Sequence, residues 1–235
     1  MTWIGSLPYF KILPFAIYVT IYFGMTGADK DYPDESYRSV FFKLLPITSL
    51  VFMVLSCASQ SPEHASRKNR ILLGLLFSMA GDACLVWRVK MFIPGLLFFA
   101  VAQILYAFAF EFSPFGGMVP FSVCVAACSS IYAYLYAGVE EPVMKVLVLV
   151  YAALIFCMGW RALVRVLREP SPGNICGLVG ALLFVASDFL IAVDKFMFPV
   201  EFASFRIMMT YYAAQLGISL SVCYTPITVF HKKNA

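Results

Sequence analysis

Long apolar runs that are almost free of charge, separated by short polar connections, make up most of this chain. Most of the runs approach or exceed the roughly 20 residues with which a helix crosses a bilayer. Because the runs are continuous rather than alternating, they predict helices and not the strands of a barrel. The pattern therefore predicts an all-α, polytopic membrane protein with eight transmembrane helices. The runs are residues 12–28, 44–62, 71–87, 91–110, 112–139, 146–160, 175–193 and 207–230.

The composition agrees with this pattern. Hydrophobic residues make up 62% of the chain and charged residues 13%, whereas soluble domains carry about 25% charged residues. The polar connections are too short to fold alone, so residues 1–235 are predicted to form a single transmembrane domain. The first run has no basic region before it, and we expect it to stay as a helix rather than be cleaved. A net charge of +4 implies no nucleic-acid partner.

The basic residues suggest an orientation. With eight spans, the two compact basic clusters in 67–70 and 161–168 fall on one side, and the acidic segment 29–35 falls on the other. Cytosolic connections carry the excess of Lys and Arg, so both termini are predicted to be cytosolic. Lys232 and Lys233 then resemble a dilysine retrieval signal, which predicts the endoplasmic reticulum membrane. A simple basic helix end is the open alternative.

Two acidic residues interrupt long apolar runs: Asp82 in the third run and Asp188 in the seventh. A carboxylate at the centre of a membrane helix costs about 2.5 to 3.5 kcal/mol, so such residues usually serve a function. Counted from the run starts, both residues are expected about 17 to 20 Å along their helices. The sequence therefore predicts two carboxyl groups at similar depth in one shared cavity.

The surroundings of the two aspartates echo each other. Leu-Leu-Phe precedes Gly81-Asp82 in the third run, and the same tripeptide precedes Ser187-Asp188 in the seventh. This echo predicts two parallel four-helix repeats, because an even number of spans returns the chain to its starting side. Chance similarity between apolar segments is the open alternative.

Polar side chains in two further runs could complete the site. Gln103 and Tyr106 lie one helical turn apart in the fourth run, and Tyr211, Tyr212 and Gln215 lie together in the eighth. Residues three or four apart share a helix face, so these groups can converge. We expect them to bind substrate beside the aspartates. The alternative is that each only hydrogen-bonds between helices or lies at the membrane interface.

Several kinds of site are excluded by what the sequence lacks. The two histidines, His64 and His231, cannot form a three-histidine zinc site, and no G-x-S-x-G motif occurs. An intramembrane aspartyl protease needs glycine where Met79 stands. No metal and no organic cofactor is expected, and carboxylate acid and base chemistry remains. The cysteines lie in or beside apolar runs without a C-x-x-C pair, so they are expected to be free thiols.

Together these residues resemble the lysoplasmalogenase membrane proteins, also called the YhhN-like family, over nearly the whole chain. Gln103 often is His in that family, so an imidazole at this position is excluded here. Asp194 often is Asn; beside Lys195, we expect Asp194 to be solvated or paired. The resemblance is carried by Lys43 in FFKLLP, Gly81-Asp82 in LFSMAGDACLVW, Tyr106 in AQILYAFAF, Trp160-Arg161 in MGWRAL, Ser187-Asp188 in ALLFVASDFLIAVDKF, and TYYAAQL from Thr210.

The resemblance implies hydrolysis of the vinyl ether bond of lysoplasmalogens, with a lysophospholipid as the partner in the bilayer. Asp82 and Asp188 would supply the acid and the base, although the sequence does not say which is which. Lys43 or Lys195 could contact the substrate phosphate; alternatively, each lysine only extends toward the headgroups. The competing hypothesis is a proton-coupled transporter or lipid scramblase that uses the same aspartates. The oligomeric state is left open.

Overall fold

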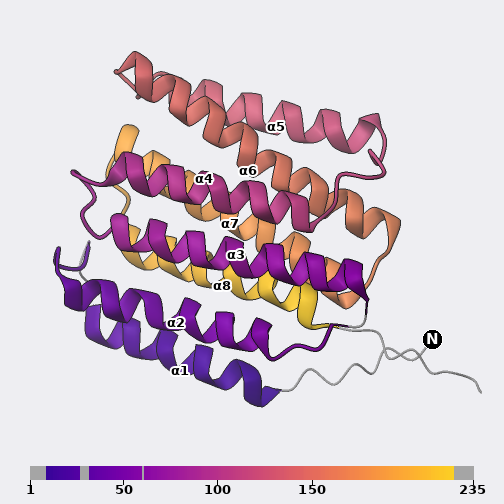
Figure 1. Ribbon diagram of the computed structural model, residues 1–235. Helices are drawn as coiled ribbons and strands as arrows, with labels where there is room; N and C mark the ends of the chain where they lie inside the picture. Colours follow the sequence, from indigo (N-terminus) through magenta and orange to yellow (C-terminus); the bar gives the residue numbers. More distant parts are fainter. Residues whose placement is uncertain (1–8, 27–31, 60, 225–235) are drawn as a thin grey trace, which may run out of the picture.

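The computed structural model describes residues 9–26, 32–59 and 61–224, and within them the chain forms eight helices and no strand (Figure 1). Each helix corresponds to one predicted run, which confirms the all-α fold class. Lys232 and Lys233, and residues 29–31 of the acidic segment 29–35, lie outside the described residues. The helices are α1 (Tyr9–Thr26), α2 (Tyr37–Leu55), α3 (Pro62–Cys84), α4 (Phe92–Ala109), α5 (Met118–Tyr136), α6 (Pro142–Arg168), α7 (Pro172–Phe196) and α8 (Ala203–Cys223).

Local sequence explains where several helices begin. Ser36, Ser61 and Ser171 precede α2, α3 and α7, and each side chain accepts a hydrogen bond from the backbone N–H three residues later. Such N-caps satisfy backbone donors that the helix itself leaves free. Proline occupies the first turn of α3, α6 and α7, where its missing N–H is not needed.

Two helices extend well beyond their predicted runs. Helix α3 begins at Pro62 and α6 ends at Arg168, because charged residues at a helix end interrupt an apolar run without stopping the helix. Asp82 lies only two residues before the end of α3, whereas Asp188 lies eight residues before the end of α7. At 1.5 Å per residue these offsets are about 3 Å and about 12 Å. The two aspartates therefore lie at different distances from the ends of their helices, and a similar depth in the membrane stays a prediction.

Five helices are long and apolar enough to cross a membrane: α2, α4, α5, α6 and α7. Helix α1 is a shorter apolar helix by the same measure, while α3 carries a strongly polar first half. The chain is thus a multi-pass membrane protein. Eight spans and an internal repeat remain predictions.

The helices pack mainly as sequential pairs. The most extensive contacts join α7 to α8 and α3 to α4, followed by α1 to α2. Helix α8 also contacts α2 and α3, and it lies behind α3 in Figure 1. Helices α5 and α6 lie along one side of the bundle, opposite α1 and α2 (Figure 1). This arrangement surrounds α8 with α2, α3 and α7.

The α7–α8 pair approaches closely at two glycines. A Cβ atom placed on Gly180 would lie 2.6 Å from the backbone nitrogen of Ile218 and 2.7 Å from the carbonyl oxygen of Ala214. A Cβ on Gly217 would lie 2.8 Å from the Cys176 carbonyl oxygen. Backbone atoms cannot move aside as a flexible side chain does, so only glycine permits this contact, as is common between membrane helices.

A disulfide bond contradicts the expectation that all the cysteines are free thiols. Cys57 follows the end of α2, Cys223 ends α8, and their Cα atoms lie 5.5 Å apart, within the range for a disulfide. The two residues are 166 positions apart in sequence, so their proximity arises from helix packing. The free cysteines among the described residues are Cys84, Cys124, Cys128, Cys157 and Cys176.

The glycine contact generates a stability prediction. Replacing Gly180 with alanine should destabilise the protein by about 1 to 3 kcal/mol, because the added methyl group forces the α7 and α8 backbones apart. Thermal unfolding of the purified protein in detergent measures this effect. Gly159 in α6 is the matched control, since a Cβ there meets nothing within 4 Å; Gly159→Ala should be neutral or stabilising by up to about 1 kcal/mol. Equal melting temperatures for the two variants would contradict the prediction.

Candidate functional site

Asp82 is buried and bonded to side chains from two other helices. Only 2% of its surface is exposed. Nζ of Lys43, from α2, lies 3.2 Å from Oδ1 of Asp82, and the hydroxyl of Tyr211, from α8, donates to Oδ2 at 2.5 Å. Lys43 also donates to the Asp82 backbone carbonyl at 3.2 Å. An ion pair and a hydrogen bond thus satisfy a carboxylate that would be costly to bury alone.

The hydrogen bonds continue from Tyr211 to α4 and back to α3. Nε2 of Gln215 donates to the Tyr211 hydroxyl at 3.2 Å, and the Tyr106 hydroxyl donates to Oε1 of Gln215 at 2.8 Å. The hydroxyl of Ser78 lies 3.4 Å from that of Tyr106. The Tyr106 ring fits against α3 because Gly74 has no side chain there. Four predicted substrate-binding residues, namely Lys43, Tyr106, Tyr211 and Gln215, therefore form one network with Asp82.

Tyr212 contacts this network through the backbone of Lys43. Its hydroxyl donates to the Lys43 backbone carbonyl at 2.9 Å, and its ring makes edge contacts with Phe15 and Tyr22 of α1. Tyr212 itself is 1% exposed. Its observed contacts hold α2 against α8, so they place the Lys43 backbone rather than a ligand.

Asp188 has a different environment. Its carboxylate accepts a hydrogen bond from the Tyr151 hydroxyl of α6. Both residues line a small cavity of about 60 Å³ with walls that include Phe99, Val148 and Phe196. We call this cavity the apolar chamber. Asp188 and the Tyr151 hydroxyl are its polar features, since the other lining residues are hydrophobic.

A larger cavity of about 310 Å³ lies toward the end of the bundle where α3 ends and α8 begins. Its charged lining residues are Lys43, Arg88, Asp194 and Lys195, and Tyr32 lies among them. We call this cavity the polar chamber. Lys195 is exposed, and its ammonium lies 4.2 Å from the centre of the Phe92 ring. Within the described residues, Lys195 forms no ion pair.

Asp194 is paired, as expected. It forms an ion pair with Arg88 at 3.1 Å, accepts a hydrogen bond from Tyr32 at 2.5 Å, and accepts another from the Val200 backbone N–H at 3.0 Å. The Arg88 guanidinium stacks 3.2 Å from the centre of the Tyr32 ring. Burial and the hydrogen bond to Asp194 raise the pKa of Tyr32 well above its usual value, so its hydroxyl stays a donor. This cluster closes one wall of the polar chamber.

The two chambers adjoin. Leu85, Phe92 and Ile191 line both of them. Asp82 lies behind Lys43, which lines the polar chamber, whereas Asp188 lines the apolar chamber. The two acidic groups therefore belong to neighbouring cavities with a common wall.

Gln103, a predicted substrate-binding residue, is buried with an amide group that forms no hydrogen bond to the described residues. It is fully buried in α4, and among the described residues neither its amide nitrogen nor its amide oxygen has a hydrogen-bond partner. Its side chain lies near Tyr151. A buried amide without partners is costly, which is typical of a position that binds a ligand or an ordered water.

Sequence reasoning missed three residues of the site: Tyr151, Arg88 and Tyr32. Tyr151 is the only polar side chain near the middle of its apolar run, and that isolation was the one available signal. Arg88 and Tyr32 lie in connections between helices, where charged and aromatic residues are ordinary. Their roles depend on contacts with Asp194, over 100 residues away.

The sequence between residues 38 and 222 matches the model of the YhhN family. The chain belongs to this family. The family match includes both aspartates and the side chains bonded to them, and it confirms the resemblance carried by the aspartate, tyrosine and tryptophan-arginine motifs.

Curated relatives of the family match most of the chain. Lysoplasmalogenase TMEM86A of Bos taurus is 38% identical over 216 residues, which cover 90% of this chain and 88% of the relative. Lysoplasmalogenase TMEM86A of Homo sapiens is 36% identical, with coverage of 94% and 92%. Lysoplasmalogenase TMEM86B of Rattus norvegicus is 34% identical, with coverage of 92% and 84%. No solved structure matches the chain.

The Lys43–Asp82 pair generates a prediction about stability. Lys43→Met should destabilise the protein by about 3 to 5 kcal/mol, because it leaves the buried Asp82 carboxyl without its counter-charge. The double variant Lys43→Met with Asp82→Asn should recover much of the loss, since no uncompensated charge remains. Chemical unfolding in detergent of the wild type, both single variants and the double variant measures the coupling. Additive effects of the two substitutions would contradict a direct pair.

Proposed function

We propose that this chain hydrolyses the vinyl ether bond of lysoplasmalogens, releasing a fatty aldehyde and a glycerophospho-base. Relatives at 34 to 38% identity over most of the chain carry the name lysoplasmalogenase. The structural observation that supports the proposal is the pair of adjoining chambers, one polar and one apolar, each associated with a buried or half-buried carboxyl group.

The two chambers fit the two ends of such a substrate. A lysoplasmalogen has one hydrocarbon chain and a phosphate-bearing headgroup, joined through a glycerol. In the proposed complex the chain enters the apolar chamber and the headgroup occupies the polar chamber, with the vinyl ether at the wall formed by Leu85, Phe92 and Ile191. The scissile bond then lies between Asp82 and Asp188.

The proposed reaction consumes one water and no other reactant. A carboxylic acid donates a proton to the alkene carbon remote from oxygen, which produces an oxocarbenium ion. A water that has lost a proton to the second carboxylate adds to the cationic carbon and forms a hemiacetal. The carbon–oxygen bond to glycerol then breaks as the second carboxyl group returns its proton to the glycerol oxygen. The first carboxylate takes the proton of the hemiacetal hydroxyl, so the aldehyde is released and both groups regain their starting states. One acid and one base suffice for these steps.

The partners of the two aspartates suggest how they share the work. The Lys43 ammonium supplies a counter-charge for an ionised Asp82, which suits the base that activates water. Asp188 has the Tyr151 hydroxyl as its bonding partner and faces hydrophobic walls, which suits the proton donor. The Tyr106–Gln215–Tyr211 chain positions the Asp82 carboxylate.

The remaining predicted residues receive roles in the same proposal. Lys195, at the exposed edge of the polar chamber, binds the substrate phosphate. Gln103, with its amide unbonded and near Tyr151, contacts the reacting groups or their water. Lys43 and Tyr212 act on Asp82 and on the α2 backbone, and Lys43 also lines the chamber.

We further propose eight spans in one transmembrane domain, built as two parallel four-helix repeats. The close pairing of α3 with α4 and of α7 with α8 supports the repeat. The basic clusters favour cytosolic termini in the endoplasmic reticulum membrane. The Cys57–Cys223 disulfide lies at the end of the bundle that carries the basic clusters. Disulfides persist mainly in oxidising compartments, so this bond favours the orientation in which that end faces the lumen. We retain the orientation given by the basic residues.

The catalytic proposal predicts that Asp82→Asn and Asp188→Asn each lower the kcat for aldehyde release more than about 100-fold, because an amide can neither donate nor accept the transferred proton. The assay uses protein purified in detergent with a lysoplasmalogen substrate. Glu201→Gln, the same chemical change at an exposed residue, should leave the rate unchanged.

A wild-type rate in either asparagine variant would refute the dyad. The transporter or scramblase hypothesis predicts a different result: lipid or proton movement across vesicles that contain the purified wild type, with no aldehyde formed. The measurement of both products and transport on one preparation separates the two hypotheses.

The assignment of Lys195 to the phosphate predicts a change in KM. Lys195→Met should raise KM for a lysoplasmalogen about tenfold with little change in kcat, because the interaction is made equally in the ground state and the transition state. Lys90→Met is the control, since Lys90 is exposed at the same end of the bundle and does not line the polar chamber. A fall in kcat at constant KM would contradict the assignment.

A further inference from the structure

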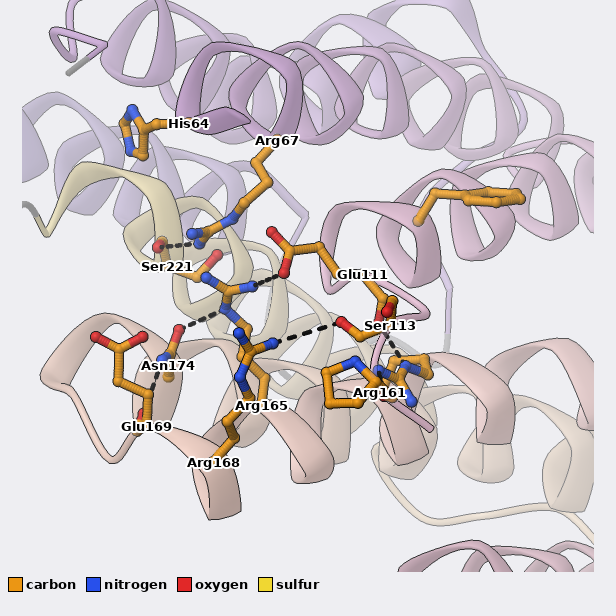
Figure 2. Close-up of polar contacts among 12 residues, drawn as sticks. His64, Arg67, Glu111, Ser113, Arg161, Arg165, Arg168, Glu169, Asn174 and Ser221 are labelled. Carbon is orange, nitrogen blue, oxygen red and sulfur yellow. Dashed lines mark hydrogen bonds and ion pairs between the residues drawn. The ribbon is translucent and has the colours of Figure 1, made fainter. Parts of the chain in front are cut away.

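Arginines concentrate at the end of the bundle opposite the two chambers. Arg67 comes from α3, and Arg161, Arg165 and Arg168 come from the last turns of α6. Two carboxylates, Glu111 and Glu169, lie among the four arginines (Figure 2). The cluster therefore carries more positive than negative charge.

Three of these arginines have structural partners. Arg161 is 1% exposed and donates to the backbone carbonyls of Glu111, Pro114 and Phe115 at 2.5 to 3.1 Å. Arg165 donates to Oδ1 of Asn174 at 2.7 Å and forms an ion pair with Glu111 at 3.0 Å. Arg168 makes a long contact of 3.4 Å with the Ser113 carbonyl. Together they hold the α4–α5 and α6–α7 connections.

Arg67 differs from the other three. One of its terminal nitrogens donates to the Ser221 carbonyl at 3.2 Å, but its buried Nε has no hydrogen-bond partner within the part of the chain that the structure describes. Among the described residues it forms no ion pair with a carboxylate. A half-buried guanidinium with an unused buried donor is unfavourable, and an anion beside it would remove the cost.

His64 repeats this pattern one helical turn earlier on α3. Its Nε2 lies 3.0 Å from the Val222 carbonyl, whereas its buried Nδ1 has no hydrogen-bond partner in residues 9–26, 32–59 and 61–224. Residues three apart share a helix face, so the two unused nitrogens belong to one side of α3. When the ring is protonated, Nδ1 becomes a second donor beside Nε of Arg67.

Arg67 and Arg165 extend toward one another from α3 and α6, and Glu111 reaches only Arg165 (Figure 2). Two guanidiniums with a single bonded carboxylate between them attract a further anion. Phosphate suits this geometry, because its oxygens accept from several guanidinium and ring donors at once. The first turn of α3, which contains His64, adds the positive end of a helix dipole.

We propose that His64, Arg67 and Arg165 form a phosphate-binding site, occupied by the headgroup of an anionic phospholipid in the leaflet at this end of the bundle. The position favours a lipid, because helix ends in a membrane protein lie at the level of the headgroups. The site is separate from the two chambers and does not depend on the catalytic proposal. Its occupant bridges α3 and α6 beside the end of α8, which Arg67 and His64 contact.

The test uses the intact protein in lipid nanodiscs. Discs of phosphatidylcholine alone are compared with discs in which phosphatidic acid replaces part of it, and a third arm adds inorganic phosphate to the phosphatidylcholine discs. Thermal unfolding and the amount of phosphatidic acid retained on extraction are measured. Wild type should melt higher in the phosphatidic acid discs and retain that lipid. The same stabilisation by inorganic phosphate alone would support the site with a soluble anion as its occupant.

The variants locate the effect. Arg67→Gln should weaken phosphatidic acid binding about tenfold, as expected for loss of a charged hydrogen-bond donor, and His64→Phe should weaken it while keeping a ring of similar size. Arg38 is an exposed residue of α2 at the opposite end of the bundle. Arg38→Gln makes the same charge change there, and this variant should bind phosphatidic acid like the wild type. Wild type that shows no response to phosphatidic acid or to phosphate overturns the proposal. Equal losses in the Arg38 and Arg67 variants would also overturn it.

Discussion

A carboxylate enclosed by apolar helices needs partners, and the partners of Asp82 determine how the centre of this bundle is built. Lys43 reaches it from α2 and Tyr211 from α8, so the requirement to satisfy one buried charge ties three helices together. The Tyr212 bond to the Lys43 backbone adds a second link between α2 and α8. In a low-dielectric interior these bonds are strong and their loss is costly, so the network specifies one arrangement.

Two cavities of different polarity lie beside this network. Toward the helix ends, Lys43, Arg88, Asp194 and Lys195 line a cavity with charged walls. Beyond the shared hydrophobic wall, Asp188 faces a cavity lined mostly by aromatic and aliphatic side chains. An amphiphile placed across this wall would have each end in a matching environment. The fold thus places a charged cavity next to a hydrophobic one, which matches the headgroup and the hydrocarbon chain of a lipid.

The helices were predictable because each apolar run must form its own backbone hydrogen bonds in a membrane. Their ends were not, since α3 begins and α6 ends within charged segments that interrupt the apolar runs. Within the site, Tyr211 and Gln215 could be predicted from their helical spacing. Tyr151 could not, because its contact with Asp188 depends on packing between α6 and α7, which no local pattern encodes.

The Cys57–Cys223 bond joins α2 to α8 at the end of the bundle remote from the chambers. The same two helices supply Lys43 and Tyr211 to Asp82. They are therefore linked through Asp82 and, at the other end of the bundle, by the disulfide. The bond also encloses every connection from α3 to α8 in a single covalent ring. A protease that nicks any of these connections therefore leaves two fragments that separate on a gel only after a reducing agent is added.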